Sequence, residues 1–200
     1  MSKIKLYPDS PSKFRLDGVR IAFPVLNEPE QFQGTGKPRY GGTFIIPGGD
    51  TAVIAKIKEL ALALMVSEVG QAKAAKTLEQ LEANAKMPYG PGNKKAEYDG
   101  FAGNFFIACH SQTAPALFDN VADPSTGKPA VLARPQNRIY AGCFVNPVIS
   151  LYYQSKWGRL CASVSGVQFA GDGDSFSGAI VASDDEFEAV QPADMDDDLA

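Results

Sequence analysis

Cationic and aromatic side chains stand next to one another at several places along the chain. Arg39 adjoins Tyr40, Lys156 adjoins Trp157, and Arg159 follows two residues later. Cations can neutralise phosphates and aromatic faces can stack on unpaired bases, and a binder of single-stranded nucleic acid needs both. The sequence therefore predicts a polyanion-binding surface formed by Lys37, Arg39, Tyr40, Lys94, Lys95, Arg134, Arg138, Tyr140, Tyr152, Tyr153, Lys156, Trp157 and Arg159.

Aromatic residues also fill cores, so each tyrosine beside a cation has a second interpretation at the rim of a β core. Trp157 differs, because it stands beside Gly158 at a predicted turn where there is no core to fill. We interpret Trp157 as a contact residue. Apolar alternation assigns the phenylalanines of the strands mostly to the core instead, namely Phe14, Phe23, Phe44, Phe105, Phe144 and Phe169.

The sequence lacks the residue combinations that catalysis or metal binding would require. His110 is the single histidine, and as neighbours in a predicted strand Cys109 and His110 point to opposite faces. The P-loop-like stretch Gly34-Thr35-Gly36-Lys37-Pro38 has Gln31 where the pattern needs glycine and Pro38 where it needs serine or threonine. We expect no enzymatic activity, no cofactor and no metal site.

Charge is distributed very unevenly along the chain. The 19 basic and 15 acidic residues of 1–183 give a net charge of +4, whereas eight acidic residues give 184–200 a charge of −8. Residues 183–200 have too few apolar side chains to offset chain entropy, and we expect them to be disordered. The tail could simply keep the protein in solution. We favour a tail that competes with DNA and binds partner proteins through Asp194, Asp196, Asp197, Asp198 and Leu199.

Hydrophobic periodicity predicts a mainly β domain with two helices. Strands are expected at 13–26, 39–47, 103–111, 141–155 and 159–169, helices at 51–69 and 71–86, and loops at 27–38 and 87–95. A small hairpin is expected around 124–127. Five antiparallel strands favour an OB-fold-like barrel with a helical insertion between strands two and three. We therefore expect one DNA-binding domain over 1–182 and an acidic tail over 183–200.

Short motifs on these strands resemble a known family. Tyr140-Ala141-Gly142-Cys143 with Val145-Asn146, the later Gly166-Val167-Gln168, and Asp99-Gly100-Phe101 are similar to phage and prophage single-stranded-DNA-binding proteins. The resemblance implies an OB-fold, DNA binding during phage replication, recombination or repair in the cytoplasm of the bacterial host, and a tail that contacts replication enzymes and restrains DNA binding. Related tails end on Phe, whereas this one ends Leu199-Ala200, which leaves the tail's partner open.

Two other classes of function remain open from the sequence. The β domain could be an interaction module of a phage structural or assembly protein, or the protein could bind duplex DNA or anneal strands. Duplex binding is also expected when the tail is displaced. A homo-oligomer is left open. No run of about 18 apolar residues occurs, so we expect no membrane partner.

Overall fold

The computed structural model describes residues 1–32 and 35–176, which form a mainly β structure with two α-helices. The elements in chain order are β1 (Lys3–Leu6), β2 (Lys13–Asp17), β3 (Val19–Phe32), β4 (Thr35–Ile46), α1 (Thr51–Val69), α2 (Gln71–Ala83), β5 (Tyr89–Pro91), the short 3₁₀ helix η1 (Gly92–Lys95), β6 (Phe105–Ser111), β7 (Ala116–Ala122), β8 (Pro129–Val131), β9 (Phe144–Gln154), the 3₁₀ turn η2 (Ser155–Trp157) and β10 (Arg159–Gly171).

In these residues ten strands join in one sheet of order β5-β6-β4-β3-β9-β10-β7-β8, with β2 pairing both β1 and β9. All pairs are antiparallel except β7 with β10. Strands β6 and β10 contact each other, but within the described part of the chain no ladder joins them, so the sheet is not closed. The predicted first strand is interrupted at Gly18, whose φ of 71° separates β2 from β3. The short strands β1, β5, β7 and β8 are additional to the five strands expected from the sequence.

The predicted loop over 27–38 is wrong for most of its length. Strand β3 continues to Phe32 and β4 begins at Thr35, so the segment is a two-stranded ribbon. Its pairing is irregular, with Glu30 opposite Arg39 and register shifts on both sides. Proline breaks a sheet only where its missing N–H is needed, and an irregular ribbon at a sheet margin tolerates it.

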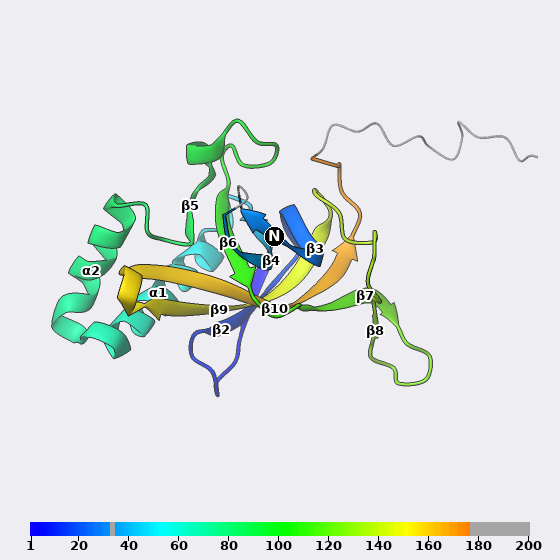
Figure 1. Ribbon diagram of the computed structural model, residues 1–200, viewed down its shortest axis with the longest axis horizontal. Helices are drawn as coiled ribbons and strands as arrows, with labels where there is room; N and C mark the ends of the chain where they lie inside the picture. The colour runs from blue at the N-terminus through cyan, green and yellow to red at the C-terminus, as the bar shows by residue number, and fades with distance from the viewer. Residues whose placement is uncertain (33–34, 177–200) are drawn as a thin grey trace, which may run out of the picture.

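The two helices lie at one end of the molecule, and the β7–β8 hairpin projects from the other (Figure 1). Both helices follow β4, and β5 intervenes before β6. Helix α1 has the predicted bounds and buries Val53, Ile57, Ala61 and Met65 in the main core. Asp50 occupies the N-cap position of α1, but its carboxylate accepts hydrogen bonds from Ser2, including one from the Ser2 N–H at 2.6 Å.

Apolar side chains pack on both faces of the central strands. The main core lies on one face and includes Phe14, Phe44 and Ile107. A smaller cluster of Ala22, Ile45 and Phe101 lies on the opposite face, which we call the outer face. The segment after η1 supplies Phe101, and Phe106 and Phe176 pack against the same cluster, so the outer face is covered at this point. No helix in the described residues is long and apolar enough to cross a membrane.

Candidate nucleic-acid interface

Strands β4 and β6 form the centre of the outer face. In β6, Ile107 and Cys109 are buried in the main core, while His110 is exposed on the opposite side, as the alternation predicts. His110 pairs with Gly41 of β4, where a Cβ atom would come within 2.3 Å of the Cys109 carbonyl oxygen. The glycine therefore allows the two strands to approach closely beside His110.

Positive charges from three separate elements converge on His110. The pKa of His110 is lowered, first because its exposed ring is still partly desolvated by the surrounding chain and then by these charges. They belong to Arg39 of β4, Arg159 of β10 and Lys95 at the end of η1. We call these three residues, together with His110, the cationic cluster. The structure thus brings together three predicted contact residues that are far apart in the sequence.

Tyr152 adjoins the cationic cluster, and its neighbour Tyr153 does not. Tyr152 of β9 pairs with Cys161 of β10 and is 37% exposed. Burial raises its pKa, the Cys161 thiol raises it further, and the charge of Arg39 lowers it. Tyr153 points to the other face and packs against the main core. Of this predicted pair, only Tyr152 is placed where it could meet a ligand on the outer face.

An aromatic group lies on the same face, around the smaller apolar cluster. The Phe23 ring is 5.1 Å from Tyr98, edge to face, and 6.1 Å from Phe101. Phe101 lies 5.8 Å from Phe106 of β6. Phe23 and Tyr98 are 50% and 45% exposed, so both rings are accessible to a ligand. We call Phe23, Tyr98, Phe101 and Phe106 the aromatic group.

Lys95 connects the two parts of the outer face. Its Nζ lies 4.8 Å from the centroid of Phe106 and 5.8 Å from that of Phe101, which are cation–π distances. The same ammonium acts on the pKa of His110. Cations and exposed rings therefore form one continuous surface. Lys94, beside it in η1, is exposed.

The prediction that Phe23 and Phe144 lie in the core is wrong. Phe23 has a φ of 50°, which takes its side chain out of the strand alternation and onto the outer face. Phe144 is 38% exposed at the start of β9, and the Arg20 guanidinium lies 5.7 Å from its ring. Strand periodicity assumes a regular backbone, so it could not detect the placement of Phe23. Phe144 instead follows the regular alternation of β9, which buries Val145 and Ile149 and turns Phe144 outward.

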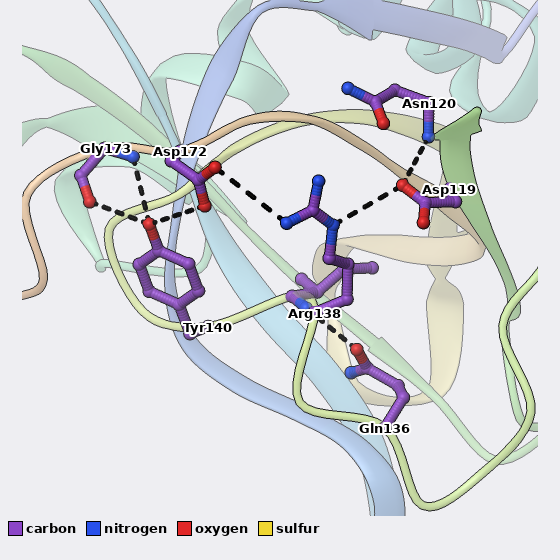
Figure 2. A network of polar contacts seen from close by, with 8 residues as sticks. Asp119, Asn120, Gln136, Arg138, Tyr140, Asp172 and Gly173 are labelled. Atoms are coloured by element: carbon purple, nitrogen blue, oxygen red, sulfur yellow. Dashed lines mark hydrogen bonds and ion pairs between the residues drawn. The ribbon is translucent and has the colours of Figure 1, made fainter. Parts of the chain in front are cut away.

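Arg138 and Tyr140 belong to a network that joins three segments of the protein, namely β7, the loop before β9 and the residues after β10 (Figure 2). Arg138 Nε lies 3.5 Å from Asp119 Oδ1 and its Nη1 lies 3.9 Å from Asp172 Oδ2. The Tyr140 hydroxyl accepts a hydrogen bond from the Gly173 N–H at 3.1 Å and lies 3.0 Å from the Gly173 carbonyl oxygen and 3.2 Å from Asp172 Oδ1. These two predicted contact residues already have partners within the chain.

Arg134 has a similar role in fixing a loop. Its Nε donates to the Leu26 carbonyl oxygen at 2.7 Å, and its Nη2 donates to the Pro115 carbonyl oxygen. Its guanidinium also lies 5.9 Å from the Tyr40 ring, which is half-buried. Arg134 therefore attaches the loop before β9 to β3, and the structure does not bring it into the cationic cluster.

The remaining predicted residues lie at the margins. Lys37 is exposed in the β3–β4 ribbon. Trp157 is 67% exposed in η2, as the turn prediction required, and the Lys156 Nζ lies 5.5 Å from its ring. In residues 1–32 and 35–176 no three His, Cys, Asp or Glu side chains gather as a metal site would need. Tail residues Asp194, Asp196, Asp197, Asp198 and Leu199 lie outside the described residues.

Comparison with known proteins gives consistent matches. The family model described as Enterobacter phage Enc34, ssDNA-binding protein, matches residues 12–200. Protein p50 of Acyrthosiphon pisum secondary endosymbiont phage 1 is 33% identical over 189 residues, which cover 94% of this chain and 99% of that protein. The single-stranded DNA-binding protein from bacteriophage Enc34, solved in complex with ssDNA, has a TM-score of 0.67 at 22% identity, covering 83% of this chain and 90% of that chain. Its C-terminal truncation has a TM-score of 0.66 at 22% identity, covering 86% and 92%.

Proposed function

Because this chain belongs to the family of the Enterobacter phage Enc34 ssDNA-binding protein, we propose that it binds single-stranded DNA without sequence preference and catalyses no reaction. The membership confirms the resemblance found in the sequence. We assign the protein a role in phage DNA replication, recombination or repair within the bacterial host.

The observation that carries this proposal is the convergence of Arg39, Lys95 and Arg159 beside exposed aromatic rings on one face. Cations on such a face can bind successive phosphates of the strand, and stacking on an aromatic ring contributes about 1–3 kcal/mol per base. Every base has a π-face, so this chemistry tolerates any sequence. None of the ion pairs among the described residues involves these three cations, which leaves their charge available to phosphates.

We further propose that the sheet is an OB-type barrel left partly open. Strands β3, β4 and β6 are consecutive neighbours, β9 pairs with β3, and β10 pairs with β9 and contacts β6. In OB-folds the face of the second and third strands, with the flanking loops, binds oligonucleotides. Taking β4 and β6 as those strands puts the cationic cluster and the aromatic group on the binding face.

A salt titration of oligo-dT binding tests the function. A protein monomer that neutralises about five phosphates of the strand should give a slope of roughly −3.5 for log K against log salt, at about −0.7 per phosphate. Full-length protein that gives no complex with oligo-dT would favour the structural or assembly module instead. Equal affinity for duplex and single strand at one salt concentration would favour duplex binding or annealing.

The acidic tail supplies a second part of the proposal. We infer that residues 184–200, with their charge of −8, compete with DNA for the cationic cluster and dock on replication partners. Deleting 184–200 should tighten single-strand binding and extend it to duplex, because a competing polyanion is removed. Gel shifts of both proteins against both ligands measure the effect. Unchanged or weaker binding after the deletion would reject competition by the tail.

A further inference from the structure

A groove separates the C-terminal end of α2 from the turn between β9 and β10. Its volume is about 560 Å³, and it is lined by Asn84, Ala85, Lys86, Gln154, Trp157 and Arg159. None of these side chains is acidic, two are cationic, and one is the single tryptophan of the chain. We propose that this groove holds one nucleotide of the bound strand, with its base against Trp157 and its phosphate on Lys86 and Arg159. The inference rests on the proposed function.

The end of α2 has a fixed geometry that positions Lys86. The Ala85 N–H donates to the Glu82 carbonyl oxygen at 3.1 Å, and the Lys86 N–H donates to the Leu81 carbonyl oxygen at 2.8 Å. This pair of bonds is a Schellman motif, which needs a left-handed residue after the helix. Ala85 has a φ of 53° in that place, where glycine is the usual residue. Because the motif satisfies the last carbonyls of α2, the groove margin is defined by side chains.

A backbone hydrogen bond joins this helix end to the outer face. The Leu160 N–H donates to the Lys86 carbonyl oxygen at 3.1 Å, across the place where β10 begins. Arg159, the preceding residue, lines the groove and also acts on His110 in the cationic cluster. Arg159 therefore belongs to both places, and a strand lying on the outer face can continue into the groove along this side chain.

Trp157 provides the apolar part of a nucleotide site. Its side chain is 67% exposed, with Lys156 beside the ring, although a buried position would be favourable for so large an apolar surface. A base stacked on the indole would cover that surface. The bound phosphate would then lie among Lys86, Lys156 and Arg159, all of them exposed.

A second groove shows why charge makes the assignment specific. It has a volume of about 460 Å³ and is lined by Glu28 and Glu30, with Arg134 already bonded to backbone carbonyl oxygens. The two carboxylates would repel a phosphate, and the Arg134 N–H groups that donate to carbonyl oxygens are not free to bind one. Both grooves are similar in size, so the side chains that line them decide which one accepts a nucleotide.

The test uses the full chain, oligo-dT, and the variants Lys86→Gln and Trp157→Ala, with Lys73→Gln as the matched control. Lys73 is exposed near the opposite end of α2. Lys86→Gln should reduce the salt slope by about 0.7, the value of one phosphate contact, and Lys73→Gln should leave it unchanged. Trp157→Ala should weaken binding roughly tenfold, within the range for one stacked base. Melting temperatures confirm that each variant is folded.

Tryptophan emission reports on the groove directly, because Trp157 is the single tryptophan. Saturating oligo-dT should quench it in the wild type and quench it less in Lys86→Gln. If the wild type binds oligo-dT with a clear salt slope, while emission is unaffected and Lys86→Gln matches Lys73→Gln, the groove is excluded and the proposed function stands. If the wild type binds no oligo-dT, both proposals fail.

Discussion

Two regions of this protein combine cations with aromatic rings, and the structure uses them differently. In the network around Arg138, the guanidinium lies 3.9 Å from the Phe169 ring and is paired with Asp119 and Asp172. In the cationic cluster, Arg39 and Arg159 have no carboxylate partner in the described residues. Paired cations hold segments of the chain together, whereas unpaired cations beside exposed rings remain available to an external polyanion. Composition alone does not separate the two uses.

Removing charge from the cluster should have the largest effect on binding. We expect the double variant Arg39→Ala with Arg159→Ala to weaken oligo-dT binding by about 3 kcal/mol or more, since hydrogen bonds to charged groups contribute about 1.5–3 kcal/mol each. The salt slope should fall by about 1.4, the share of two phosphates. Fluorescence anisotropy over a range of salt concentrations measures both quantities.

Arg138→Gln is the matched control for that comparison, because it removes one arginine that already has carboxylate partners. Its salt slope should equal that of the wild type. If Arg138→Gln reduced the salt slope as much as the single variant Arg39→Ala does, the paired cation of the network would bind DNA as well as the unpaired cations of the cationic cluster. That result would contradict the proposed difference between the two regions.

Changes in the network around Arg138 should affect the stability of the fold and not DNA binding. Tyr140→Phe removes the hydroxyl that meets Gly173 and Asp172 and leaves the ring in place. We expect the free energy of unfolding to fall by about 1 kcal/mol, the typical value of a hydrogen bond. For a chain of this size that lowers Tm by about 2–4 °C, which calorimetry can measure. A loss of DNA affinity at unchanged Tm would instead place Tyr140 in the interface.

The smallest expected effect concerns pH. Burial and three cations lower the pKa of His110, so the imidazole is neutral at pH 7. A phosphate bound beside the imidazole would raise the pKa of His110. DNA binding would then be coupled to the uptake of a proton by His110 as the pH falls below the ordinary pKa of histidine. Affinity should therefore rise severalfold between pH 7.5 and 5.5, and His110→Gln should abolish the rise. A wild-type affinity that is independent of pH would show that His110 does not lie beside a bound phosphate.

Sequence patterns predicted those elements whose regularity is local. The apolar spacing of Ile57, Ala61 and Met65 predicted helix α1, and alternation in β6 placed Cys109 and His110 on opposite faces. The exposed position of Trp157 followed from its neighbour Gly158. These features depend on residues close in sequence, and the structure confirms them.

Features that depend on tertiary contacts escaped prediction. Phe23 leaves the core because of one backbone angle, which no alternation encodes. Arg138 finds its partners Asp119 and Asp172 only after the chain has folded, so it resembled Arg39 in the sequence. Lys86 was expected at the end of the predicted helix over 71–86, whereas α2 ends at Ala83 and Lys86 lines the groove.

The origin of the cationic cluster links ligand binding to folding. Its cations come from residues 39, 95 and 159, so a nascent chain has no complete site until β10 has left the ribosome and paired with β9. A polyanion held there would connect β4, η1 and β10 like a noncovalent cross-link. Ligand at one hundred times its Kd would then add about 2.7 kcal/mol to the free energy of unfolding. Among residues 1–32 and 35–176 no ladder joins β6 to β10, and a bound ligand would connect these two strands noncovalently.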